Sequence, residues 1–244
     1  MSRKNVSSAM LLLLICGALL ATPASAQHLQ EVKGTLVTVS AGRNEVFGID
    51  PHGAPWRYNA TKQSFAKING AKSLVQIAVG GGTLSQLDEV WAVASNGDVY
   101  RFNYNTKAFD QISGASLSQI AVGVGVEDDC HAYEVWGITP GLQVGRYDYC
   151  SSQFHQSPGS FLAQISTGAG DVWGIIGGQI YQYSFTAENF VEISGALAQI
   201  AVGVNDVWGV DTTEEVSRYD PNTGSFDLYV NGGAARVAAG GDGV

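Results

Sequence analysis

The chain is 244 residues long, carries a formal net charge of −9 at pH 7 and contains 31 glycines. An acidic chain without clusters of Lys and Arg is a poor match for the phosphate backbone of nucleic acids or for an anionic membrane surface, so neither partner is expected. Hydrophobic residues make up 45% of the sequence, which is enough for a folded core and excludes global disorder.

The first 26 residues are predicted to be a secretory signal peptide. Residues 1–4 read MSRK, residues 9–21 read AMLLLLICGALLA and residues 24–26 read ASA, which gives a basic start, an apolar run and a small-residue cleavage site. The apolar run is short for a membrane span, and no other run of about 18 apolar residues follows it. We therefore expect residues 27–244 to form a secreted or periplasmic mature chain without membrane insertion.

A segment that ends in glycine recurs along the mature chain. Clear copies are LVQIAVG at 74–80, LSQIAVG at 117–123 and LAQIAVG at 197–203. A period near 40 residues is typical of propellers and solenoids. A helical solenoid is excluded by the glycine content and by the absence of a 3.6-residue periodicity. The six glycines that end the copies, at spacings of 35 to 45 residues, are Gly42, Gly80, Gly123, Gly168, Gly203 and Gly240.

Each repeat contains four segments of strand-forming residues separated by Gly, Asn and Asp. In the second repeat, Asn96-Gly97 predicts a two-residue type I′ hairpin turn, which would place Trp91 opposite Phe102 as a cross-strand aromatic pair. Four antiparallel strands per repeat predict an all-β propeller of four-stranded blades, each covered on both faces by its neighbours. The four segments of this repeat are LVQIAVG (74–80), EVWAV (89–93), YRFN (100–103) and FDQISGA (109–115).

The two ends of the mature chain carry parts of a further repeat. Residues 29–34 read LQEVKG, like a fourth segment, and residues 235–240 read ARVAAG, like a first segment. We expect a six-bladed ring in which 29–34 completes the last blade as its outer strand, with the C-terminal part of that blade truncated. The alternatives are a natural ring of five and a half blades, or a five-bladed ring with the spare strands packed elsewhere.

The third repeat is the longest and the least regular. Cys130 and Cys150 fall in two connections that lie at the same end of an antiparallel blade, and an exported chain favours a disulfide between them. The alternative is two unpaired buried thiols. The insertion is either ordinary loop variation or a rim that contacts a ligand or a protein partner.

An acidic residue precedes the second segment of every complete repeat, and an aromatic residue follows it two positions later. Carboxylates accept hydrogen bonds from vicinal sugar hydroxyls, and an exposed ring covers the apolar face of a sugar, so this pattern favours carbohydrate binding. The structural alternative is that the acid bonds to an Arg of the third segment and that the ring packs between blades. The candidate residues are Glu45, Glu89, Trp91, Glu134, Trp136, Asp171, Trp173, Asp206 and Trp208.

No pattern of residues indicates catalysis, a cofactor or a metal. The histidines do not recur at one position of the repeat, no pair has metal-ligand spacing, and the sequence has no GxSxG or P-loop. We expect a protein that is not an enzyme. If it were a propeller lyase or hydrolase, only the third repeat, with His131 and His155, is asymmetric enough to hold the catalytic group.

The order "IAVG", "DVWGV", an aromatic third segment and "ISG" resembles the tectonin repeat family, which includes tectonins and fish-egg lectins, over residues 29–244. The resemblance implies a six-bladed propeller and a secreted lectin that binds glycans, including methylated sugars or lipopolysaccharide. Repeated weak sites would suit multivalent binding. The main alternative is a propeller scaffold without a sugar site that binds a protein partner at the rim of the third repeat.

Overall fold

The computed structural model describes residues 32, 34–83, 86–125 and 130–239. These residues form twenty strands in five antiparallel four-stranded sheets, one for each complete repeat, and within the described residues no helix is long and apolar enough to cross a membrane. The predicted signal peptide lies outside the described residues.

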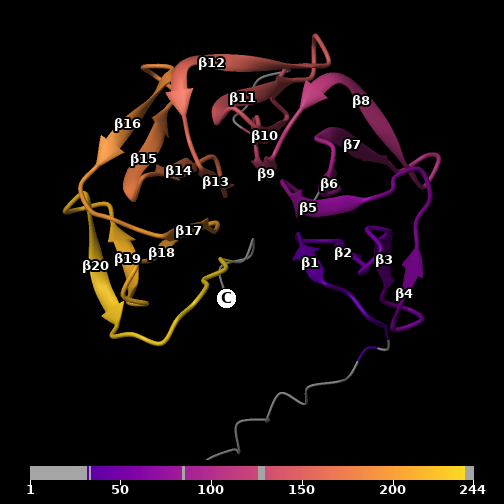
Figure 1. The fold of residues 1–244 in the computed structure, drawn as a ribbon, viewed down its shortest axis with the longest axis horizontal. Coiled ribbons are helices and arrows are strands. Elements are labelled where there is room, and N and C mark those ends of the chain that lie inside the picture. The colour runs from indigo at the N-terminus through magenta and orange to yellow at the C-terminus, as the bar shows by residue number, and fades with distance from the viewer. Residues whose placement is uncertain (1–31, 33, 84–85, 126–129, 240–244) are drawn as a thin grey trace, which may run out of the picture. The chain divides into compact units, whose positions relative to one another are not determined.

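The five sheets are arranged as the blades of a propeller. The strands that begin the five sheets contact one another in chain order, so they lie innermost, and the fourth strand of each sheet is outermost. Figure 1 shows this succession from the indigo blade one to the yellow blade five. Blade one contains β1 (Thr38–Ala41), β2 (Val46–Ile49), β3 (Pro55–Asn59) and β4 (Ser64–Lys67).

The other four blades repeat the same order of strands. Blade two contains β5 (Leu74–Gly80), β6 (Glu89–Ala94), β7 (Asp98–Asn103) and β8 (Ala108–Ser116), and blade three contains β9 (Gln119–Val124), β10 (Tyr133–Ile138), β11 (Gln143–Asp148) and β12 (Gln153–Phe161). Blade four contains β13 (Gln164–Thr167), β14 (Val172–Ile176), β15 (Gln179–Ser184) and β16 (Asn189–Ile193), and blade five contains β17 (Gln199–Val202), β18 (Val207–Val210), β19 (Val216–Asp220) and β20 (Ser225–Val230).

The hairpin between β6 and β7 differs from the one predicted. Gly97 has a φ of +89° and donates its N–H to the carbonyl of Ala94 at 2.9 Å, whereas Asn96 does not have a positive φ. This is a three-residue loop with a left-handed glycine at its end, not a type I′ turn. The extra loop residue shifts the pairing by one position, so Trp91 lies opposite Arg101 rather than Phe102. The prediction of a Trp91–Phe102 pair was therefore wrong.

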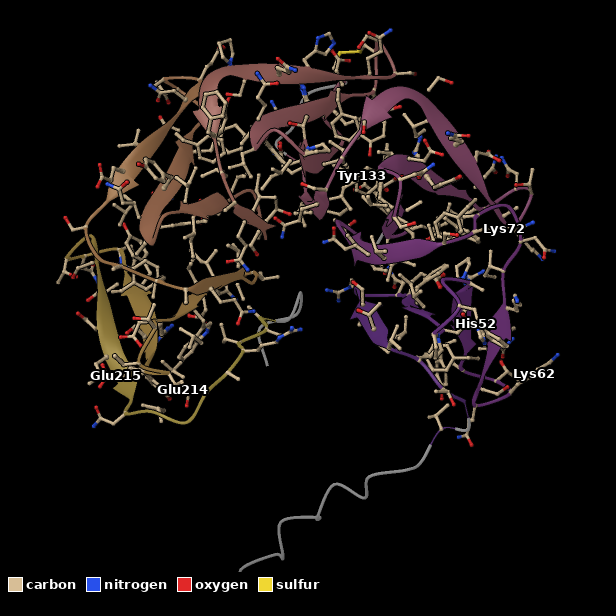
Figure 2. All side chains as sticks on the ribbon, in the orientation of Figure 1. His52, Lys62, Lys72, Tyr133, Glu214 and Glu215 are labelled. Atoms are coloured by element: carbon tan, nitrogen blue, oxygen red, sulfur yellow. A yellow bond between two sulfur atoms is a disulfide. The ribbon has the colours of Figure 1, made fainter. Side chains whose placement is uncertain are left out.

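This register places the two rings on opposite faces of the blade, because side chains alternate along a strand. Trp91 is fully buried and packs edge-on against the rings of Tyr147, with centroids 4.7 Å apart, and Phe154, 5.9 Å apart, both in blade three. Trp136 and Trp173 make the same pair of contacts with the blades that follow them. Side chains fill the space between neighbouring sheets (Figure 2), so each layer of the core belongs to two blades.

The repeated first segment joins neighbouring inner strands through Gln and Gly. The side-chain amide of Gln76 donates to the carbonyl of Ile120 at 2.9 Å and accepts from its N–H at 2.8 Å. A Cβ on Gly123 would lie 2.5 Å from the carbonyl oxygen of Gly168, so glycine allows inner strands to approach closely around the axis.

The described residues form five blades, not the six that were expected. Residues 235–239 do not form a strand, since the described residues provide no second strand for them to pair with. Val237 nevertheless exchanges two 2.9 Å hydrogen bonds with the Gln199 side chain, as Ile120 does with Gln76. In the predicted outer strand at 29–34, residues 32 and 34 are described and are not in a strand, and the rest lies outside the described residues.

Candidate functional site

In blades one, two, three and five, the acidic residue, the ring and an Arg meet on one face of the blade. In blade two, Glu89 and Trp91 are two residues apart on β6, and Arg101 lies opposite Trp91 on β7. Arg101 donates to both carboxylate oxygens of Glu89, from Nε at 2.7 Å and from Nη2 at 2.6 Å, and the indole Nε1 of Trp91 donates to the same carboxylate at 3.0 Å. Because Glu and Trp are two residues apart on one strand, their side chains and the Arg form one hydrogen-bonded unit, the Glu–Trp–Arg unit.

Blade three repeats this unit in its most buried form. Glu134 has no exposed surface, and its carboxylate accepts from Trp136 Nε1 at 2.7 Å and from Arg146 Nε at 2.8 Å. In blade one, Glu45 and Arg57 form the same pair beside Phe47. The carboxylates of Glu45, Glu89 and Glu134 therefore already accept hydrogen bonds from side chains of their own blade.

The Arg of the unit also contacts a ring of the next blade. The guanidinium carbon of Arg101 lies 5.8 Å from the ring centroid of Trp91 and 5.0 Å from that of Tyr149, which is within the range of cation–π attraction. Burial lowers the pKa of Arg101, but the hydrogen bond and the negative charge of Glu89 outweigh it and raise the pKa overall. Arg101 therefore stays charged and ties two blades together.

Blade four departs from this arrangement. Asp171 replaces Glu, and the position of the Arg is taken by Gln182, whose amide donates to Asp171 at 3.3 Å. Because Asp is one methylene shorter, the buried indole nitrogen of Trp173 has no hydrogen-bond partner within the described residues. In blade five, Asp206 pairs with Arg218 at 2.8 Å and Trp208 is half-buried.

These positions do not match the predicted sugar-binding role. Trp91, Trp136 and Trp173 are 0–1% exposed, and a ring without accessible surface cannot cover a sugar. Of the two interpretations that the sequence left open, these three rings follow the structural one and pack between blades, because the hairpin register turns them toward the next blade. Among the described candidates, only Asp206 with Trp208 combines a partly accessible acid with a partly accessible ring.

The predicted disulfide is confirmed. Cys130 and Cys150 are bonded, with their Cα atoms 5.0 Å apart, and the N–H of Tyr149 donates to the carbonyl of Cys130 at 2.9 Å. Both sulfurs lie near the carboxylate of Asp148. Because the thiols are joined to each other, this group does not offer thiolate ligands to a metal.

Three blades carry a groove at an equivalent place that the sequence did not reveal. Each groove is formed around the Arg of the third strand and the residue opposite it on the outer strand. In blades two and five the turn after the third strand also lines the groove. Those opposed pairs are Arg101–Asp110, Arg146–His155 and Arg218–Asp227. Blades one and four have Ala66 and Val191 on the outer strand instead.

The groove of blade three is the largest of the three, at about 540 Å³. It is lined by His131, Arg146, Asp148, His155 and Gln156 of its own blade, and by Tyr183, Phe185 and Glu188 of blade four. The hydroxyl of Ser151 lies 2.8 Å from Nε2 of His155, whose distance to the Asp148 carboxylate is 3.7 Å. Two histidines from the irregular repeat therefore do lie in one open, polar groove.

Sequence reasoning also missed a buried carboxylate at the joint of blades one and two. Asp88 is 1% exposed and accepts backbone N–H groups of Arg43, Asn44, Glu45 and Gly82 at 2.6–3.1 Å. It lines a small central cavity together with several of the repeated glycines. In the sequence, the two adjacent acids Asp88 and Glu89 are the feature that could have indicated this buried carboxylate. A carboxylate that accepts four N–H groups has a structural role.

The fold was compared with solved structures. Human WBSCR16 is similar with a TM-score of 0.55 and 14% identity, over 72% of this chain and 57% of that one. A structure described as YCF48 bound to D1 peptide has a TM-score of 0.56 and 15% identity, over 80% of this chain and 67% of that one. Prp20p from Saccharomyces cerevisiae has a TM-score of 0.60 and 9% identity, over 84% of this chain and 67% of that one. At these identities the likeness concerns the fold alone.

A search of curated proteins found no match. The model of the tectonin domain matches residues 35–229, which covers all five blades except the last residue of β20. The repeated QIAVG and VWG segments are the inner strands and the Trp-bearing strands of those blades. The chain therefore belongs to the tectonin domain family.

Proposed function

We propose that this protein is a secreted, non-catalytic lectin that binds glycans through repeated weak sites, and that these sites are the three rim grooves. The observation that carries the proposal is the recurrence of an open polar groove at an equivalent place in blades two, three and five. The predicted signal peptide supports an extracellular or periplasmic place of action.

The grooves offer the side chains that sugars need. In blade two, Asn103, Asn105 and Asp110 present amide and carboxylate groups beside Tyr104. In blade three, Gln156 and Asp148 lie across from the rings of Tyr183 and Phe185. Amides and carboxylates exchange hydrogen bonds with hydroxyls, while ring faces cover C–H groups. In blades two and three, the Arg of the groove is held from inside by the buried Glu of its unit.

Weak sites of this kind would act together. Each groove is open to solvent, so a single sugar would leave much of its surface exposed and bind weakly. A polymer or a cell surface that presents many copies of the sugar would engage several grooves at once and gain avidity.

A glycan array probed with residues 27–244 tests this function. We expect binding to a defined subset of glycans, stronger at high glycan density than at low density. A folded sample that stays silent across a broad array, including methylated sugars and lipopolysaccharide, would rule the lectin out.

A protein-binding scaffold is the second candidate, and one observation favours it. The outer strand β20 exposes Leu228, Tyr229 and Val230 by 48–65%, and an exposed apolar edge strand can pair with a peptide. One of the similar structures is described as bound to D1 peptide. The Prp20p structure is described together with its binding properties to Gsp1p and histones. Capture of a defined extracellular protein that Tyr229→Lys abolishes would support this function.

A further inference from the structure

We infer that the rim grooves select glycans that carry a protonated amine, that is, sugars with a free amino group rather than an N-acetyl group. The inference rests on the proposed lectin function and specifies its ligand class. It follows from the charges that line the three grooves and from how the arginines of those grooves are already bonded.

Each groove contains one arginine, no lysine and two carboxylates among its lining residues, and the groove of blade three also contains His131 and His155. The carboxylates are Glu89 and Asp110 in blade two, Asp148 and Glu188 in blade three, and Asp220 and Asp227 in blade five. The same imbalance therefore occurs three times at equivalent places.

The arginines do not cancel this negative charge for a ligand, because each arginine is already paired with a carboxylate of its own blade. Arg146 bonds to Glu134, which is fully buried, and Arg218 bonds to Asp206, which is partly accessible. Arg101 donates from Nε and Nη2 to the carboxylate of Glu89. A guanidinium already bound by a carboxylate is a poor receptor for the carboxylate or sulfate of an acidic sugar.

One carboxylate of each groove faces solvent. Asp110, Glu188 and Asp227 are all exposed. In blade two, Asn103 donates its amide to Asp110 at 2.7 Å, which orients that carboxylate without neutralising it. An ammonium group can be bound by such a carboxylate and by the face of a nearby ring, and Tyr104 and Tyr183 are rings of two of the grooves.

The net charge of the whole protein also favours a cationic ligand. The formal net charge of −9 attracts cations over longer distances. Each contact between an ammonium and a surface carboxylate is weak. A polymer with an amine on every sugar would place several such contacts on several grooves at once. The preferred ligand is therefore a polycationic aminoglycan.

The test compares two oligosaccharides of equal length, a hexamer of glucosamine and a hexamer of N-acetylglucosamine, each immobilised at the same density at about pH 5.5, where most amines of the first are protonated and ordinary surface carboxylates are still ionised. They differ in the charge at the amine and in its acetyl group. We expect the glucosamine hexamer to bind about tenfold more tightly, and the preference to shrink as salt is raised from 50 to 500 mM.

The variant Asp110→Asn/Glu188→Gln/Asp227→Asn removes one exposed charge from each groove. It should reduce the preference to less than about threefold. The matched control is Glu192→Gln, which removes an exposed charge from β16 outside the grooves and should keep the preference.

Equal affinity for the two hexamers, or a preference that the triple variant retains, would overturn the inference. The lectin function would survive if the array finds other glycans. If no glycan binds at all, both proposals fail.

Discussion

The indole nitrogen of Trp136 donates to the carboxylate of Glu134, two residues earlier on the same strand, at 2.7 Å. Both side chains are at most 1% exposed. The pair that suggested a sugar site in the sequence is therefore an internal hydrogen bond that fixes a ring between two blades.

Neutralising this carboxylate should strongly destabilise the fold. In Glu134→Gln, Arg146 loses its charged partner in a buried position, and removing one member of a buried pair costs about 3–5 kcal/mol. Urea unfolding measures the change, with Glu192→Gln as the exposed control. A loss below about 1 kcal/mol would mean that the pair contributes no more than a surface ion pair.

The hydrogen bond that blade four lacks should be restored by substitution. Asp171→Glu extends the carboxylate toward the unpaired indole nitrogen of Trp173, and a new buried hydrogen bond contributes about 1 kcal/mol. Adding Gln182→Arg should restore the full unit and stabilise the protein further. The reverse change in blade two, Glu89→Asp, should destabilise it. Thermal unfolding of the four proteins tests this series, and a destabilised Asp171→Glu variant would contradict it.

Removing the disulfide should weaken the third blade. Cys130→Ser/Cys150→Ser opens a loop with a sequence separation of 20, which should lower the free energy of unfolding by about 3 kcal/mol. Wild-type protein treated with a reductant should lose stability to the same extent. If reduction and substitution leave the unfolding curve unchanged, the bridge does not constrain the unfolded chain.

Acid should destabilise the turn at Asp211. Hydrogen bonds from the backbone N–H of Glu215 and from the hydroxyl of Thr213 lower the pKa of Asp211. A lowered pKa means that the folded state favours the ionised form, so its contribution is present above the ordinary value of about 3.9 and is lost as the pH falls through the folded pKa. Unfolding free energies measured from pH 7 to pH 2 should fall less steeply in Asp211→Asn than in wild type below about pH 4. Parallel curves would show that this carboxyl does not contribute.

The strand order of the blades and the disulfide could be predicted from the sequence, because a repeat with four β-forming segments has few other ways to cover both faces. The type of the hairpin between β6 and β7 could not be predicted. A glycine after Asn96 fits both a type I′ turn and a three-residue loop with a left-handed Gly97, and the two differ by one residue of register. That one residue decides whether Trp91 faces a strand neighbour or the next blade.

The grooves were not predictable for a related reason. In blades two and five their residues come mainly from the third strand, the turn after it and the outer strand, and in blade three partly from the following blade. Asp110 and Asp227 look like ordinary exposed acids until the register places them opposite Arg101 and Arg218.

The central claim is that the grooves, and not the buried rings, contact the glycan. Blocking them with Asn105→Trp, Gln156→Trp and Asn222→Trp, all at exposed groove positions, tests it most directly. The control is Lys62→Trp, exposed on blade one and labelled in Figure 2. Binding to the strongest array ligand should weaken with each blocked groove and be lost in the triple variant, with unchanged thermal unfolding, while the control binds normally. A folded triple variant that binds as tightly as wild type would contradict the account.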